Sequence, residues 1–221
     1  MITLNILNFD ESSAAALCAK PAERLGANFR SFLSEGGWAV LEIAPSQNAA
    51  EFAEMIVENF APKAFLGNPY EFLTARLRER GARVTFAESC TGGLLASRVT
   101  AVSGASEIFD GSLVTYSDRL KTQWLKVSPD TLRGFGAVSE ECAREMAVGA
   151  LAVANSGFAA AISGIAGPDG GSAAKPVGTV FIAVADRAGA IFSERLLLKG
   201  DRLTIQSAAA AHALRLLLNA I

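Results

Sequence analysis

The sequence predicts a layered α/β fold whose sheet is partly antiparallel. Strand-like apolar runs alternate with segments of helical periodicity along the 221 residues, which is typical of helices packed on a sheet. Near the C-terminus, two strand-like runs, 178–186 and 190–199, are separated only by the turn Arg187-Ala188-Gly189. So short a connection joins antiparallel strands. The hydrophobic content of 51%, rich in alanine and glycine, predicts a tightly packed core.

The first 68 residues read as strand, helix, strand and helix. The apolar runs 2–9 and 38–44 predict strands, and 49–60 predicts a helix. Lys20-Pro21 is expected to interrupt the first helical stretch, because proline has no backbone N–H to donate there. The turn-like sequence APKAFLGNPY follows, and we place a boundary near Gly67 to Pro69. The prediction is an extension over 1–68 and a main domain over 69–221.

The main domain contains the clearest helix and strand signals. Helices are predicted at 70–81, 93–102, 117–127, 139–155 and about 203–220, and strands at 83–87, 111–117, 158–166 and in the two C-terminal runs. Gly81 is expected to end the first of these helices. Ser117 and Ser139 are expected to cap two others at their N-termini.

Composition and charge exclude several classes of protein. A net charge of −2 with 19% charged residues offers no basic stripe, so we expect no nucleic-acid partner. No apolar run approaches the roughly 18 residues of a membrane span, so no membrane partner is expected. The N-terminus lacks a signal-peptide pattern, and three cysteines without CxxC spacing suit a cytoplasmic location. Pairs of zinc ligands are absent, so we expect no metal site.

The single histidine limits the possible chemistry. His212 lies in the apolar helix near the C-terminus, where a packing role is expected. A Ser-His-Asp or Cys-His arrangement therefore has no base. A nucleophile in this chain would need a lysine, a carboxylate or a tyrosine as its proton acceptor. A lysine can serve when burial or nearby cations lower its pKa from about 10.4.

The sequence AESCTGG places Ser89, Cys90 and Thr91 where a strand gives way to a helix. Side chains at that position point out of the sheet edge, and backbone N–H groups of the first helical turn can bind an anion or an oxyanion. Gly92 lets another group approach the backbone closely. Three interpretations remain open at this stage. Ser89 can be a nucleophile, Cys90 can be one, or Ser89 or Thr91 can merely cap the helix.

Three further segments carry candidate functional residues. In VTYSDRLK, Tyr116 follows a strand, and Lys121 lies in the next helix, either over the strand ends or as an ordinary surface lysine. The sequence SGIAGPDGG, residues 163–171, is either a ligand-wrapping loop or a plain strand connection. Arg202 precedes the last helix and is either a phosphate clamp or a surface ion-pair residue.

Together these segments resemble the CinA C-terminal domain family. AESCTGG, VTYSDRLK, GAVSEE, SGIAGPDGG, KPVGTV and GDR occur in that family's order, from about Tyr70 to the end of the chain. The resemblance implies a three-layer α/β/α sandwich with a mixed sheet and usually a homodimer. It also implies a metal-free, cofactor-free nicotinamide-nucleotide amidase of pyridine nucleotide salvage. Such an enzyme hydrolyses nicotinamide mononucleotide to nicotinate mononucleotide and ammonia by a Ser-Lys type mechanism.

The resemblance also assigns roles to residues. Ser89, Tyr116 and Lys121 match the family's catalytic residues, and Ser163 stands where the family has a small hydroxyl residue, often threonine. Either Tyr116 or Ser163 can relay the proton. The residues implied to bind the nucleotide substrate are Cys90, Thr91, Gly92, Gly164, Gly167, Gly170, Gly171 and Arg202.

Two other functions and the role of the extension stay open. The same loops can form a catalytically silent pyridine-nucleotide binding module, or the chain can be a protein-interaction module, in line with the family's competence and DNA-damage labels. Full-length CinA proteins carry a much longer N-terminal domain than 68 residues can contain, so the family assigns no role to residues 1–68. That segment is either a packing or dimer-stabilising extension or a cover that regulates or restricts substrate access.

Overall fold

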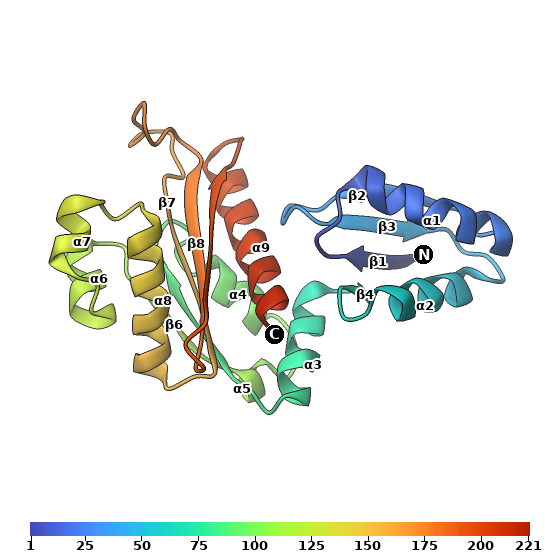
Figure 1. Ribbon diagram of the computed structural model, residues 1–221, viewed down its shortest axis with the longest axis horizontal. Coiled ribbons are helices and arrows are strands. Elements are labelled where there is room, and N and C mark those ends of the chain that lie inside the picture. The colour runs from blue at the N-terminus through green and yellow to red at the C-terminus, as the bar shows by residue number, and fades with distance from the viewer. The chain divides into compact units, whose positions relative to one another are not determined.

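A computed structural model describes all of residues 1–221, which divide into two compact units, Met1–Leu73 and Thr74–Ile221 (Figure 1). Each unit has its own sheet, with four strands in the first and five in the second. Helix α3 (Pro69–Glu79) contains the point of division. No helix is both long and apolar enough to span a lipid bilayer.

The first unit is a βαββαβ arrangement. Its elements are β1 (Ile2–Ile6), α1 (Glu11–Leu25), β2 (Phe29–Leu33), β3 (Ala39–Ile43), α2 (Ala49–Phe60) and β4 (Ala64–Leu66). The strands form an antiparallel sheet in the order β2-β3-β1-β4, as in ferredoxin-like domains. One core joins the sheet to both helices, with Leu4 and Leu41 packed against Cys18 and Phe52. The unit therefore buries its own apolar face.

Two expectations for this unit were wrong. Pro21 lies inside α1, which runs unbroken from Glu11 to Leu25. The buried Ala14, Cys18 and Ala22 lie on one face of α1 on both sides of the proline, and this packing outweighs the single lost hydrogen bond. Strands β2 and β4 were also missed. Both lie at the edges of the sheet, and neither shows a clear hydrophobic pattern, since β2 is largely exposed and β4 has only three residues.

The second unit is a three-layer α/β/α sandwich, as the resemblance implied. After α3 its elements are β5 (Val84–Glu88), α4 (Leu94–Thr100), α5 (Ala105–Ile108), β6 (Phe109–Val114), α6 (Asp118–Leu125), α7 (Pro129–Gly134), α8 (Glu140–Ala154), β7 (Phe158–Gly164), β8 (Thr179–Asp186), β9 (Ile191–Leu197) and α9 (Arg202–Ala220). The sheet order is β6-β5-β7-β8-β9. Strands β6, β5 and β7 are parallel, and β7, β8 and β9 are antiparallel, which confirms the mixed sheet.

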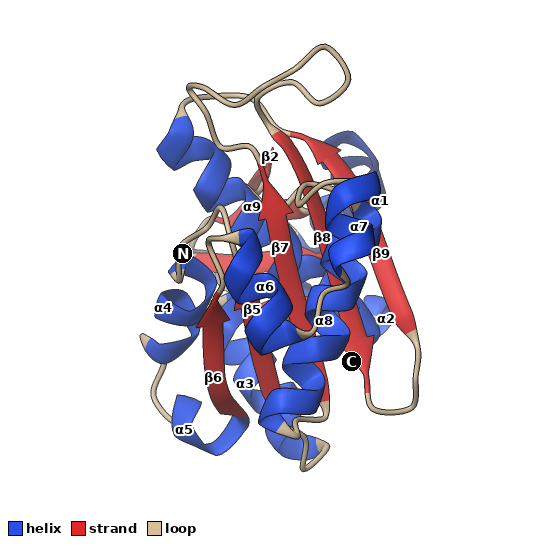
Figure 2. Cartoon of the chain, turned by 90° about the vertical axis from the view of Figure 1, so that its left-hand side faces the viewer, coloured by secondary structure: helices blue, strands red, loops and turns tan.

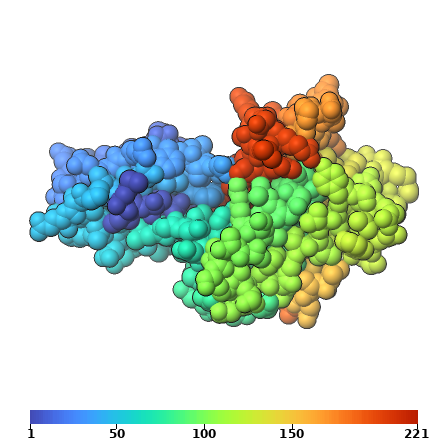
Figure 3. All heavy atoms as spheres, turned by 180° about the vertical axis from the view of Figure 1, so that it is seen from behind, coloured from blue at the N-terminus to red at the C-terminus, as the bar shows by residue number.

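Helices cover both faces of this sheet. Helix α8 packs on one face and α9 on the other (Figure 1). Helix α4 lies beside α9 on that second face, where Arg98 donates a hydrogen bond to the Ser207 carbonyl at 3.1 Å. Seen from behind, the red C-terminal segment lies against the green residues from the middle of the chain (Figure 3). Ser117 and Ser139 cap α6 and α8 as predicted, and Gly81 follows the end of α3 with a φ of +57°. The short helices α5 and α7 were not predicted.

Small residues set the spacing between α8 and its neighbours. Ala159 and Ala161 of β7 share a core with alanines of α8, so helix and sheet approach closely. On α8, a Cβ at Gly149 would lie 1.9 Å from the backbone oxygen of Leu125 at the end of α6. Only glycine permits this contact. The contact fixes the end of α6, the helix that carries Lys121.

Candidate active site

The predicted site residues come together at one edge of the second sheet. Strands β5, β6 and β7 are parallel, so their carboxyl ends meet at that edge (Figure 2). A pocket of about 270 Å³ opens there. Its lining includes nine predicted residues, namely Ser89, Cys90, Tyr116, Lys121, Ser163, Gly164, Gly167, Gly170 and Arg202. The remaining lining consists of Asp118, Asp169, Ala137, Val138, Ile165 and Ala166.

Lys121 is buried against the candidate nucleophile. Its side chain comes from the first turns of α6, and the residue is only 1% exposed, so the surface-lysine interpretation is wrong. Its Nζ donates hydrogen bonds to Ser89 Oγ at 3.0 Å and to the Thr115 carbonyl at 2.7 Å. Burial lowers the pKa of Lys121, because a buried site disfavours the charged ammonium form. A lysine in this setting can hold a neutral amine next to a hydroxyl.

Glu88, which the sequence analysis did not single out, caps helix α4. Its fully buried carboxylate accepts hydrogen bonds from the backbone N–H groups of Gly93, Leu95 and Ala96 at 3.0–3.1 Å. The N-cap residue itself is Gly93, which has no side chain that could cap the helix. The interpretation that Ser89 or Thr91 caps the helix is therefore wrong, and the Ser89 hydroxyl is left to Lys121.

The same contacts decide which backbone amides can bind an oxyanion. The amides at the start of α4 are occupied, since those of Gly93, Leu95 and Ala96 donate to Glu88 and that of Leu94 donates to the Thr91 carbonyl. The Ser89 N–H donates to the Ile162 carbonyl at 3.0 Å. The N–H groups of Cys90 and Thr91 make no hydrogen bond to another residue. They lie directly after Ser89, which is where an oxyanion would form during attack by its hydroxyl.

Cys90 is a poor rival nucleophile. Its side chain is buried, and burial raises the pKa of the thiol to about 11, so it is protonated near neutral pH. Its side chain has no hydrogen-bonded base, whereas the Ser89 hydroxyl contacts Lys121. The Cys90 carbonyl accepts a hydrogen bond from the Gln206 side chain at 2.6 Å, which holds the loop in place.

Arg202 links the glycine-rich loop to Tyr116. Its guanidinium donates to the Gly167 carbonyl at 2.7 Å and to the Tyr116 hydroxyl at 2.8 Å, and it has no carboxylate partner. Arg202 is therefore not a surface ion-pair residue. Tyr116 is 61% exposed at the mouth of the pocket, whereas Ser163 is buried and donates to the Ala137 carbonyl at 2.6 Å.

Backbone conformation and close packing require glycine at several positions in and next to the loop. Gly167 and Gly170 have φ values of +80° and +88°, which side-chain-bearing residues rarely adopt. A Cβ at Gly164 would lie 2.7 Å from the Val180 side chain. Three other predicted substrate-binding residues, Thr91, Gly92 and Gly171, lie outside the pocket lining.

The pocket also contains two carboxylates that the sequence analysis missed. Asp118 and Asp169 lie within the segments VTYSDRLK and SGIAGPDGG that were singled out for other residues. A carboxylate one position after a helix cap, or inside a glycine-rich turn, is common without any function. Only the fold shows that both side chains line the same pocket.

Comparisons with known proteins identify the family to which the second unit is similar. Residues 68–221 match the CinA C-terminal domain. The nicotinamide-nucleotide amidohydrolase PncC of Escherichia coli K12 is 49% identical over 141 residues, which are 64% of this chain and 86% of that protein. A CinA-like protein of Geobacter sp. M21 is 52% identical over 130 residues, 59% of this chain but only 31% of that protein.

Solved structures give the same assignment. The competence/damage inducible protein CihA of Agrobacterium tumefaciens superposes with a TM-score of 0.65 at 41% identity, covering 69% of this chain and 97% of that one. A CinA superfamily protein of Escherichia coli gives a TM-score of 0.66 at 37% identity, covering 69% and 88%. The chain therefore belongs to the CinA C-terminal domain family.

Proposed function

We propose that the chain hydrolyses the carboxamide of nicotinamide mononucleotide to nicotinate mononucleotide and ammonia, with Ser89 as nucleophile and Lys121 as base. The contact of 3.0 Å between Lys121 Nζ and Ser89 Oγ, made by a lysine that is 1% exposed, carries this proposal. Relatives that are 47–49% identical are named nicotinamide-nucleotide amidohydrolase. The names of these relatives support the choice of substrate, and the contact between Lys121 and Ser89 supports the choice of nucleophile and base.

The first half of the reaction forms an acyl-enzyme. Neutral Lys121 keeps one N–H on the Thr115 carbonyl, which directs its lone pair at the Ser89 hydroxyl. Ser89 Oγ attacks the carboxamide carbon while its proton passes to Lys121 Nζ. The N–H groups of Cys90 and Thr91 bind the resulting oxyanion. Lys121 then protonates the departing nitrogen, the C–N bond breaks and ammonia leaves.

The second half returns the enzyme to its starting state. Water attacks the nicotinoyl ester of Ser89 and gives its proton to Lys121. Collapse of the second tetrahedral intermediate breaks the C–O bond, and the proton returns to Ser89 Oγ. Tyr116 or Ser163 relays protons between Lys121 and the substrate, and Arg202 with the 167–171 loop holds the nucleotide. No step requires a metal or a cofactor.

The test is ammonia release from nicotinamide mononucleotide, measured with and without EDTA. Ser89→Ala should lower the rate by at least about 10³-fold, because no other hydroxyl contacts the base. Cys90→Ala is the matched control and should keep most of the activity. Activity lost in EDTA and restored by a divalent ion would contradict the metal-free mechanism. Binding of the nucleotide by wild-type protein without ammonia release would instead identify a silent binding module.

We further propose that the chain acts in the cytoplasm as a homodimer, and that residues 1–68 form an extension outside the amidase domain. The family resemblance supports the homodimer, and the separate core of the first unit supports the extension. Light scattering of the purified full chain tests the first statement. A monomer at assay concentrations that still releases ammonia would contradict it.

A further inference from the structure

Asp118 is an unpaired carboxylate beside the proposed base. It lines the pocket from the first turn of α6 and makes no hydrogen bond or ion pair with another residue. Asp118 lies one helical turn before Lys121 and lines the same pocket, and its negative charge opposes the lowering of the Lys121 pKa by burial. Asp169 also lines the pocket, but in the loop whose Gly167 carbonyl accepts from cationic Arg202.

The proposed substrate carries a positive charge close to its reacting group. The nicotinamide ring of the mononucleotide is joined to ribose through its ring nitrogen and is therefore a pyridinium cation. Its carboxamide sits on the same ring, and the carboxamide carbon must reach Ser89 Oγ, 3.0 Å from Lys121. Because Asp118 lies one turn before Lys121 on α6 and lines the same pocket, we expect the bound ring to come near its carboxylate.

We infer that Asp118 is a specificity-determining residue that selects pyridinium carboxamides over neutral aromatic carboxamides of the same shape. The inference rests on the proposed function. A neutral Lys121 does not neutralise the negative charge of Asp118. The Asp118 carboxylate can therefore attract the positively charged ring of the substrate. A single carboxylate at a partly solvated position favours a nearby cation about fivefold. The preference should weaken as salt screens the interaction.

The experiment compares two ligands that differ in ring charge. The probes are nicotinamide mononucleotide and benzamide riboside 5′-phosphate, in which a neutral carbon ring replaces the pyridinium. Calorimetry measures their binding to Ser89→Ala and to Ser89→Ala with Asp118→Asn, so turnover does not interfere. We expect the added substitution to weaken the cationic nucleotide about fivefold and the neutral one less than about twofold.

Asp130→Asn in the same Ser89→Ala background is the matched control. Asp130 is likewise an aspartate in the first turn of a helix after a serine cap, but it lies outside this pocket. It should leave both affinities unchanged. If Asp118→Asn weakens both ligands equally, or neither, the inference is wrong.

Failure of the proposed function would look different. Wild-type protein would then release no ammonia from nicotinamide mononucleotide, whatever the binding data show. Selective weakening of the cationic ligand at low salt, with the difference reduced at high salt, would support the role of Asp118 in either case. A difference that does not depend on salt would indicate a change of shape rather than of charge and would overturn the inference.

Discussion

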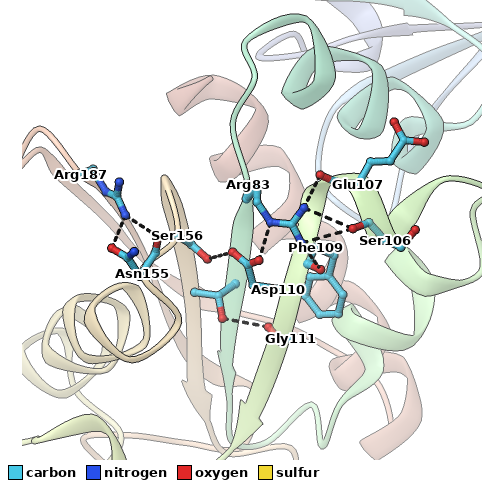
Figure 4. Close-up of polar contacts among 10 residues, drawn as sticks. Arg83, Ser106, Glu107, Phe109, Asp110, Gly111, Asn155, Ser156 and Arg187 are labelled. Atoms are coloured by element: carbon cyan, nitrogen blue, oxygen red, sulfur yellow. Dashed lines mark hydrogen bonds and ion pairs between the residues drawn. The ribbon is translucent and has the colours of Figure 1, made fainter.

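The two ends of the parallel strands use charged residues in opposite ways. At the amino end, Arg83 contacts the Asp110 carboxylate at 2.5 Å and the carbonyls of Glu107 and Phe109 at 2.5 and 3.1 Å (Figure 4). Asp110 also accepts from the Ser156 hydroxyl. Burial alone would raise the pKa of Asp110, but these two hydrogen bonds hold it below its ordinary value. At this end, each of the two charged side chains therefore has a partner of opposite charge.

At the carboxyl end, the charges are left unmatched. Lys121 is buried without a carboxylate partner, Asp118 has no ion pair, and Arg202 donates only to neutral oxygens. Unmatched groups cost stability but can interact with a ligand. Polar groups whose hydrogen bonds are all satisfied thus join elements of the fold, whereas groups with spare hydrogen-bonding capacity mark the candidate site. The following substitutions test this division.

The largest effect is expected at Lys121. As a base it must be neutral, so the rate should rise with pH through its lowered pKa and level off above it. Arginine keeps the charge but cannot give up a proton, so Lys121→Arg should lose activity nearly as fully as Lys121→Ala, by about 10³-fold. Single-turnover rates of ammonia release measure this. Lys126→Arg, on the exposed C-cap of α6, is the control.

A Lys121→Arg enzyme that retained a substantial part of the rate would assign Lys121 the role of balancing substrate charge. Lys121 would then resemble Arg83 at the amino end of the strands, which only donates hydrogen bonds to oxygen atoms. Tyr116 would become the next candidate base.

Position 149 tests whether the carboxyl end depends on packing behind it. A Cβ there meets the backbone of Leu125, so Gly149→Ala must displace the end of α6 and with it Lys121. Overpacking of this kind costs about 1–3 kcal/mol, and a shift of about 1 Å at a catalytic group costs about 10²-fold in rate. Gly134→Ala in α7, where nothing lies within 4 Å of the added Cβ, is the control. Equal activity of the two variants would show that Lys121 tolerates displacement of its helix.

Much of the second unit could be predicted from the sequence. Strands β7 and β8 are nearly continuous apolar runs, and helix α8 begins at its predicted serine cap, so local signals and tertiary structure agree there. The segments with Ser89 and Lys121 were correctly placed at strand ends. Their contact across 32 residues follows from the parallel pairing of β5 and β6, which brings both strand ends to one edge.

What the sequence could not predict depends on contacts between distant elements. Glu88 looks like the last residue of a strand, and its role as the cap of α4 requires the turn at Gly92 and Gly93 to bring the amides back to it. The helix through Pro21 depends on packing against the sheet, and the edge strands β2 and β4 depend on pairing with β3 and β1. Local propensity does not contain this information.

Removing residues 1–68 should have a small effect on chemistry. Every residue that lines the pocket belongs to Thr74–Ile221, so kcat/KM should stay within about threefold of that of the full chain. We expect the shortened chain to associate differently or to aggregate, since the cut leaves the apolar residues of α3, which contains the point of division, at the new N-terminus. Ammonia release and light scattering measure the two effects. A monodisperse, folded but inactive product would contradict the division into extension and enzyme.

The smallest expected effects are on the stability of the fold. A substitution at the amino end of the parallel strands should lower stability, and one at the carboxyl end should raise it. Arg83→Met removes hydrogen bonds to a carboxylate and to backbone carbonyls, and because the side chain is 41% exposed we expect a loss of about 1–2 kcal/mol. Lys121→Met fills a similar volume without a buried ionisable amine that lacks a carboxylate partner, and it should raise Tm by about 2–4 °C. Calorimetry near pH 7 measures both, with kcat unchanged in the first variant and abolished in the second.

The pH dependence supplies an independent check on that sign. The folded chain holds Lys121 at a lowered pKa, so between that value and the unfolded value of about 10.4 the unfolded chain binds the extra proton. Above the pKa of the unfolded chain, Lys121 therefore does not reduce the free energy of unfolding. As the pH falls from that value through the pKa of the folded chain, this stability is progressively lost. Wild-type stability should rise with pH across this window relative to that of Lys121→Met. If Lys121→Met instead lowers Tm as Arg83→Met does, the lysine is a structural partner, and the two ends do not differ in the way proposed.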